Sequence, residues 1–189
     1  GIIGKHLPYH KIVNAAPALV KGLSPSGGNK FARAIMTTDL KLKEIAVGIR
    51  LSGKTVIVGA CAKGSGMIEP NMATMLGFVT TDADISAGML KTALKHATER
   101  SFNSITVDGC MSTNDMVTLQ ANGLAGNKRI TRAHADFKKF YEALEFVCVD
   151  LAKKIVIDGE GATKFLTIHV TGAANESQAK RIAKAVANS

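Results

Sequence analysis

The sequence lacks several features that would reveal its class at once. It has no Trp, only 5% aromatic residues and 4 Pro among its 189 residues. Its longest apolar stretch, residues 56–62, has the length of a buried strand and falls short of the ~18 residues that cross a bilayer. We therefore expect no membrane-spanning segment and an interior built from aliphatic side chains.

Cysteine is also scarce. Cys61, Cys110 and Cys148 are far apart, odd in number and contain no CxxC pair, which argues against a disulfide framework and a zinc site. His6 and His10 are four residues apart but have no carboxylate or thiol companion nearby, so we expect no bound metal. The cysteine pattern indicates a reducing compartment, and we expect a cytoplasmic protein.

Basic residues, in contrast, are in excess. The chain has 24 Lys and Arg against 15 Asp and Glu, a net charge of +9. These cations are spread along the sequence without a basic run or interleaved aromatics, which is typical of a solvated basic surface rather than of a nucleic-acid-binding protein. We expect no nucleic-acid partner, although a non-catalytic basic binding module remains an alternative.

Helical and strand patterns alternate along the chain, which predicts an α/β fold. The predicted helices are 8–20, 31–36, 86–100, a helical turn at 116–120, a long helix that Thr131 caps, and 177–187. The predicted strands are 44–51, 55–60, 74–81, 105–107 and 165–170. The stretch 63–73 is rich in Gly, Pro, Asn and Ser and predicts an irregular loop.

One motif points in a misleading direction. Residues 48–55 satisfy GxxxxGK[ST], the phosphate-binding loop of nucleotide hydrolases. That loop needs a following helix, whose N-terminal N–H groups bind the phosphates. Here the next residues, 56–58, are Val-Ile-Val and predict a strand. Ser52 and Gly53 are therefore predicted to form a hairpin turn, and nucleotide hydrolysis is disfavoured.

The end of the irregular loop offers a different chemistry. A small residue, Ala73, precedes a hydroxyl residue, Thr74, where the loop meets a predicted strand. The Thr74 hydroxyl could attack the carbonyl of Ala73 to form an ester, and water would then release an N-terminal threonine. Its α-amine, with an unperturbed pKa of ~7.7–8, is suited to activate the neighbouring hydroxyl as a nucleophile. On composition alone, an ordinary glycine-rich turn before a strand explains the same residues.

Four motifs in order carry a family resemblance. They are AIMTTD at 34–39, KGSGMI with PNMATML at 63–76, VDG with STND at 107–115, and DGEGATK at 158–164. With these motifs the sequence resembles the ornithine acetyltransferases, also called glutamate N-acetyltransferases or arginine biosynthesis bifunctional proteins, along its whole length.

The resemblance implies a self-processing acyltransferase of arginine biosynthesis. Its precursor would be cut between Ala73 and Thr74, and Thr74 would carry an acetyl group from N-acetylornithine to glutamate. No cofactor is implied, although some members of the family accept acetyl-CoA as a co-substrate. By the same resemblance, the substrate-binding residues fall on Thr37, Lys63, Thr74 and Glu160.

The resemblance also implies the architecture and the assembly. We expect a layered α/β/β/α sandwich in which residues 1–73 are the C-terminal part of an α chain and 74–189 the N-terminal part of a β chain, together one globular unit. Two α and two β chains would form a heterotetramer. Gly1 would belong to the oxyanion hole, and we expect the sequence to be truncated at both ends relative to the family.

The alternative enzyme class is an N-terminal-nucleophile amidohydrolase or aminopeptidase. It would share the self-cleavage chemistry but give the acyl group to water instead of to glutamate.

Overall fold

The computed structural model describes residues 4–68, 75–110 and 114–189. The chain divides into two compact units, Gly1–Phe31 and Ala32–Ser189. Helix α1 (Tyr9–Lys21) lies in the first unit and buries none of its residues, and the short helix α2 (Gly28–Ala34) crosses the boundary between the units. Within the described ranges, no helix is both long and apolar enough to span a membrane.

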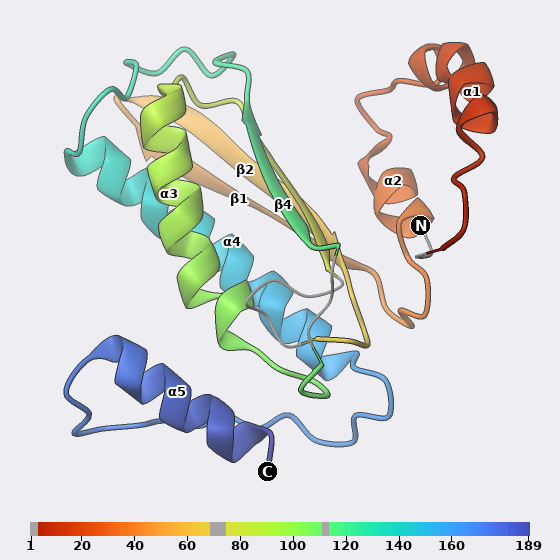
Figure 1. The fold of residues 1–189 in the computed structure, drawn as a ribbon. Helices are drawn as coiled ribbons and strands as arrows, with labels where there is room; N and C mark the ends of the chain where they lie inside the picture. Colours follow the sequence, from red (N-terminus) through yellow and green to blue (C-terminus); the bar gives the residue numbers. More distant parts are fainter. Residues whose placement is uncertain (1–3, 69–74, 111–113) are drawn as a thin grey trace. The chain divides into compact units, whose positions relative to one another are not determined.

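The second unit is built on a mixed four-stranded sheet, which confirms the predicted α/β class (Figure 1). Its strands are β1 (Lys43–Leu51), β2 (Lys54–Lys63), β3 (Leu76–Thr81) and β4 (Met116–Ala121), in that spatial order. The first three strands pair antiparallel, whereas β3 and β4 pair parallel. A parallel pair needs a crossover, and helix α3 (Ala87–Arg100) lies on this connection.

The hairpin between β1 and β2 turns at Ser52 and Gly53, as predicted. Both residues have positive φ angles, 48° and 78°, which is the backbone of a tight type I′ turn. A strand, β2, follows this turn where a phosphate-binding loop would require a helix. The nucleotide-binding motif at 48–55 is therefore a coincidence of sequence.

Two helices, α3 and α4 (Ala135–Ile157), lie side by side along the sheet (Figure 1). Helix α4 carries an apolar stripe that is buried against the sheet and α3, with Leu144, Cys148, Leu151 and Ile155 all at 0% exposure. Helix α4 begins after His134, whose ring nitrogen accepts the Asp136 N–H, so the predicted cap at Thr131 is wrong. The predicted C-terminal helix is confirmed as α5 (Glu176–Ala187).

Three further predictions of local structure are wrong. The turn predicted at 116–120 is strand β4, because pairing with β3 overrides a weak local preference. Residues 105–107, predicted as a strand, are irregular and follow the 3₁₀ helix Phe102–Ser104. Residues 165–170 are irregular because no other described strand pairs with them.

Candidate functional site

A small pocket of about 410 Å³ contains three of the residues singled out by the family resemblance. Thr37 precedes β1, Lys63 ends β2, and Glu160 follows α4. The Lys63 Nζ donates a hydrogen bond of 3.1 Å to the Thr37 Oγ1. The remaining lining residues are Thr38, Ser65, Gly66, Met67, Asp108 and Cys110.

Glu160 is held by its backbone, and its side chain lines the pocket. Its N–H donates to the carbonyl of Ser65 at 2.6 Å. Its carboxylate lies over Gly66 so closely that a Cβ on Gly66 would be 2.8 Å from the Glu160 Oε2. Within the described part of the chain, no hydrogen bond to this carboxylate is present, so it is available to a cationic group of a ligand.

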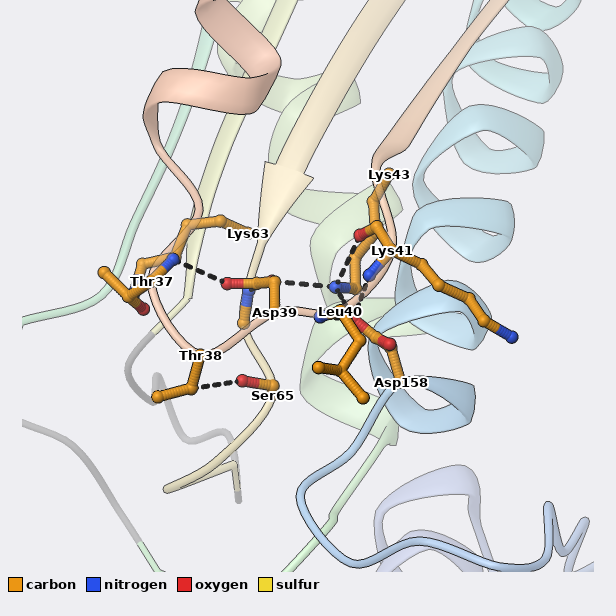
Figure 2. A network of polar contacts seen from close by, with 10 residues as sticks. Thr37, Thr38, Asp39, Leu40, Lys41, Lys43, Lys63, Ser65 and Asp158 are labelled. Carbon is orange, nitrogen blue, oxygen red and sulfur yellow. Dashed lines mark hydrogen bonds and ion pairs between the residues drawn. The ribbon is translucent and has the colours of Figure 1, made fainter.

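Behind the pocket lies a buried ammonium group between two carboxylates (Figure 2). The Lys43 side chain is 1% exposed, and its Nζ lies 2.7 Å from the Asp39 Oδ1 and 2.6 Å from the Asp158 Oδ2. A third hydrogen bond, of 3.2 Å, reaches the carbonyl of Lys41. All three ammonium protons can therefore be used, as a buried cation requires.

The carboxylates of this network stay ionised. Burial acts to raise the pKa of Asp39, but hydrogen bonds from the Gly64 N–H, the Lys43 ammonium and the Thr37 N–H outweigh it and lower the pKa overall. Burial also acts to raise the pKa of Asp158. Hydrogen bonds from the Lys43 ammonium and the Lys41 N–H outweigh this effect, so the pKa of Asp158 is lowered as well. The network is an ion-paired unit at neutral pH.

Two other aspartates hold the backbone on both sides of residues 69–74. Asp108 accepts the N–H groups of Met67 and Ile68 at 2.5 and 2.9 Å. Asp115 accepts the Met75 N–H at 2.7 Å. Met67 has a φ of 57°, a left-handed conformation that costs a non-glycine residue of order 1 kcal/mol. The Asp108 contacts compensate for this strain at the pocket wall.

Asp115 differs from the ion-paired aspartates in its electrostatics. Burial raises its pKa, while the hydrogen bond from the Met75 N–H and the charge of Lys63 oppose this increase. Its Oδ2 is buried and has no hydrogen-bond partner among the residues that the structure describes. The charge of Lys63 therefore acts both in the pocket and on Asp115, whose carboxylate accepts the Met75 N–H.

Gly1, Ala73 and Thr74 lie outside the described residues. His6 precedes α1 and His10 lies within it, so the pair is not carried on one helix face. In the described ranges, no group of three His, Cys, Asp or Glu side chains is arranged to hold a metal ion.

Size alone would not have identified this pocket. A larger cavity, of about 790 Å³, lies between α4, α5 and residues 162–170 and contains none of the predicted site residues. The smaller pocket offers an ammonium from Lys63, a carboxylate from Glu160 and a hydroxyl from Thr37. That set can bind the carboxylate and amino groups of one small zwitterion.

Sequence reasoning gave no role to Lys43, Asp108 or Asp115. Asp108 and Asp115 stand within the VDG and STND motifs, and Asp39 and Asp158 within the AIMTTD and DGEGATK motifs. The aspartate in each of these four motifs was the available signal. Lys43 carries no such signal, because a lysine at a strand start is usually exposed.

The fold and the pocket define an α/β protein with a small pocket lined by charged and hydroxyl side chains. Comparison with known sequences narrows this class, since a sequence model described as "ArgJ family" matches residues 1–189. The chain belongs to the ArgJ family. It resembles the arginine biosynthesis bifunctional protein ArgJ of Symbiobacterium thermophilum, with 54% identity over all of this chain and 47% of that protein.

Two further proteins of the same name are similar to this chain. The arginine biosynthesis bifunctional protein ArgJ of Bacillus subtilis is 51% identical over the whole chain and 46% of its own length. The crystal structure of the protein of that name from Bacillus halodurans is 54% identical, with a TM-score of 0.59 over 61% of this chain and 55% of that one. The chain thus spans about half the length of the curated relatives it matches.

Proposed function

We propose that the protein containing this chain is a self-processing acetyltransferase of arginine biosynthesis that moves the acetyl group of N-acetylornithine to glutamate. The observation that carries the proposal is the convergence of Thr37, Lys63 and Glu160 on one pocket in a chain that matches the ArgJ family from end to end. These residues come from three distant segments, and each has the chemistry that an amino-acid substrate needs.

The first step is self-cleavage. The Thr74 Oγ attacks the carbonyl carbon of Ala73, the peptide C–N bond breaks, and the carbonyl is transferred to the oxygen as an ester while the nitrogen becomes an amine. Water hydrolyses the ester, which leaves a carboxylate on Ala73 and a free hydroxyl and α-amine on Thr74. The amine then acts as the general base for that hydroxyl.

The second step is acetyl exchange. The Thr74 Oγ attacks the acetyl carbonyl of N-acetylornithine, and ornithine leaves with the proton that the α-amine has taken up. The amine of glutamate attacks the acetyl-threonine ester, N-acetylglutamate leaves, and the threonine hydroxyl is restored. Lys63 binds a substrate carboxylate, Glu160 binds a substrate amino group, and Gly1 contributes a backbone N–H to the oxyanion.

The proposal also covers the assembly. Residues 1–73 belong to the α chain and 74–189 to the β chain of a layered α/β/β/α sandwich, and two of each chain form a heterotetramer. Acetyl-CoA is a second acetyl donor for those members that are bifunctional, and the cytoplasm is the compartment.

The test uses the full-length protein and its Thr74→Ala variant. Mass spectrometry of the wild type is expected to detect a polypeptide that begins at Thr74, and N-acetylglutamate is expected to form from N-acetylornithine only when glutamate is present. Thr74→Ala is expected to abolish both, whereas Thr80→Ala, an exposed position on β3, is expected to retain both. Acetate release that does not depend on glutamate would instead identify the amidohydrolase, and an uncut wild type without product would refute the proposal.

A further inference from the structure

The buried network of Lys43, Asp39 and Asp158 lies behind the pocket without lining it. Lys43 begins β1, Asp39 lies in the turn before that strand, and Asp158 caps the C-terminal end of α4. The side chains are 1–2% exposed, so they are beyond the reach of a ligand in the pocket. Their contacts with the backbone indicate what the network does (Figure 2).

Asp39 uses both of its oxygens to hold the pocket backbone. Its Oδ1 accepts the Gly64 N–H at 2.7 Å in addition to the Lys43 ammonium. Its Oδ2 accepts the N–H of Thr37 at 3.2 Å. Gly64 follows Lys63 directly, so one carboxylate fixes the backbone at both members of the Lys63–Thr37 hydrogen bond.

Asp158 uses one oxygen for all of its contacts with the loop. Its Oδ2 accepts the Leu40 and Lys41 N–H groups at 3.0 and 3.1 Å as well as the Lys43 ammonium. This carboxylate lies two residues before Glu160. The end of α4 and the loop that carries Thr37 are therefore joined through a single atom.

Ser65 makes two further contacts that join the segments of the pocket. The Ser65 carbonyl accepts the Glu160 N–H at 2.6 Å, and the Ser65 and Thr38 hydroxyls are 2.6 Å apart. The three segments that supply Thr37, Lys63 and Glu160 are thus connected to one another at the level of the backbone.

The choice of charged residues here is not explained by stability alone. Well-packed apolar residues of similar volume are often as stabilising as a buried ion pair, because desolvation offsets much of the Coulomb attraction. Hydrogen bonds to a carboxylate fix the positions of the groups that donate them, which apolar packing does not.

We propose that Asp39, Lys43 and Asp158 are positioning residues that set the spacing of Thr37, Lys63 and Glu160 for substrate binding. This inference rests on the proposed function, since that function supplies the substrates. It assigns the two carboxylates unequal tasks. Asp39 needs both oxygens for backbone donors, whereas Asp158 needs only one.

The unequal tasks allow a test with a matched pair of substitutions. Asp158→Asn keeps an oxygen that can accept from Leu40, Lys41 and Lys43. Asp39→Asn removes the same charge, but the Asn side chain has only one oxygen. The Thr37 and Gly64 N–H groups bond to different oxygens of Asp39, so one of them loses its acceptor.

The experiment measures the binding of glutamate and of ornithine by calorimetry in the cleaved full-length protein, where no turnover occurs because neither ligand carries an acetyl group. Asp39→Asn is expected to raise the Kd of both ligands about tenfold or more, because small misplacements of binding groups are costly. Asp158→Asn is expected to change the Kd by less than about threefold. Equal effects of the two substitutions, whether large or absent, would overturn the inference.

Two controls keep the result interpretable. Asn127→Ala breaks a buried polar cluster with Asp84 and Lys128 that is remote from the pocket, and is expected to leave both Kd values unchanged even where it lowers the unfolding midpoint. Asp158→Ala is expected to weaken binding where Asp158→Asn does not, which tests the inference even if Asp39→Asn fails to fold.

Failure of the proposed function would have a different signature. In that case the wild type would bind neither ligand and would form no N-acetylglutamate, which overturns both proposals. If the wild type binds both ligands and transfers acetyl, but the matched pair behaves alike, the positioning role alone is refuted.

Discussion

The aspartates around the pocket fall into two groups that do the same task by different electrostatics. Asp39 and Asp158 accept backbone N–H groups while paired with the ammonium of Lys43, and the pKa of each is lowered. Asp115 also accepts a backbone N–H, but the hydrogen bond described for it is from Met75 alone and burial raises its pKa. A buried carboxylate that accepts several N–H groups and an ammonium therefore favours its charged form, whereas one that accepts a single N–H does not.

Glu160 completes the comparison. Its carboxylate accepts no hydrogen bond from any residue the structure describes, and it lies in the pocket rather than behind it. The aspartates hold the protein's own backbone, whereas Glu160 is left to meet a ligand. The same chemical group thus serves either to fix structure or to bind, depending on whether the fold has already supplied donors.

Removal of the buried cation is expected to have the largest effect. Lys43→Met leaves Asp39 and Asp158 buried without their counter-ion, which is expected to lower the free energy of unfolding by about 3–5 kcal/mol. Urea denaturation at pH 7 measures this free energy of unfolding, and Lys54→Met, at an exposed position on β2, is the control. A loss as small as that of a surface ion pair, below about 1 kcal/mol, would mean that the network contributes little.

The second largest effect is expected in the pH dependence of stability, to which the ion-paired Asp39 and Asp158 contribute. Because the folded-state pKa values of Asp39 and Asp158 are lowered, their stabilisation is present above the unfolded pKa of ~3.9 and is lost as pH falls through the folded values. Asp39→Asn is expected to cost about 1–3 kcal/mol at pH 7, and the difference from wild type should shrink in acid. Unfolding midpoints from pH 7 downward measure this, and Glu142→Gln, an exposed carboxylate of α4, is expected to leave the curve unchanged.

Asp115→Asn should behave in the opposite way. With a raised folded-state pKa, the stabilisation from Asp115 is present below its unfolded pKa and is lost as pH rises through the folded value. The amide oxygen of Asn can still accept the Met75 N–H, so we expect equal or slightly higher stability at pH 7. The same pH series compares the two variants directly, and a loss at pH 7 as large as that of Asp39→Asn would contradict the contrast.

Gly66→Ala should have the smallest effect on stability and a clear effect on activity. The new Cβ would displace the flexible Glu160 carboxylate rather than the backbone, so the unfolding free energy is expected to change by less than about 0.5 kcal/mol. In the full-length enzyme we expect kcat/KM for acetyl transfer to fall about 10- to 100-fold, since the carboxylate is misplaced. Gly88→Ala in α3, where a Cβ meets open space, is the control, and equal activity of the two variants would remove Glu160 from the site.

Local patterns predicted the parts of the fold that local interactions determine. Ser52 and Gly53 adopt the turn that their sequence favours, and α3 and α4 follow their helical periodicity. Strand β4 was mistaken for a helical turn because its conformation depends on β3, about 40 residues earlier in the chain. Residues 165–170 have strand-like side chains, but a strand also requires a partner.

The site divides in the same way. Thr37, Lys63 and Glu160 were found through a family resemblance, and the structure brings them to one pocket. The partnership of Lys43 with Asp158 could not be predicted, because the two are 115 residues apart. No spacing rule connects such positions, and only the packing of α4 against β1 brings them together.

The pairing of β2 with β3 has a consequence for the proposed self-cleavage. The bond between Ala73 and Thr74 lies in the connection between these strands, which are neighbours in the sheet from Val58 opposite Thr81 to Lys63 opposite Leu76. Scission would cut the covalent path without touching this ladder, so the two polypeptides should travel as one species through gel filtration and come apart only in denaturant. After scission, the backbone hydrogen-bonding groups of β3 that face β2 would still be paired with β2, so this side of β3 would not become an exposed sheet edge.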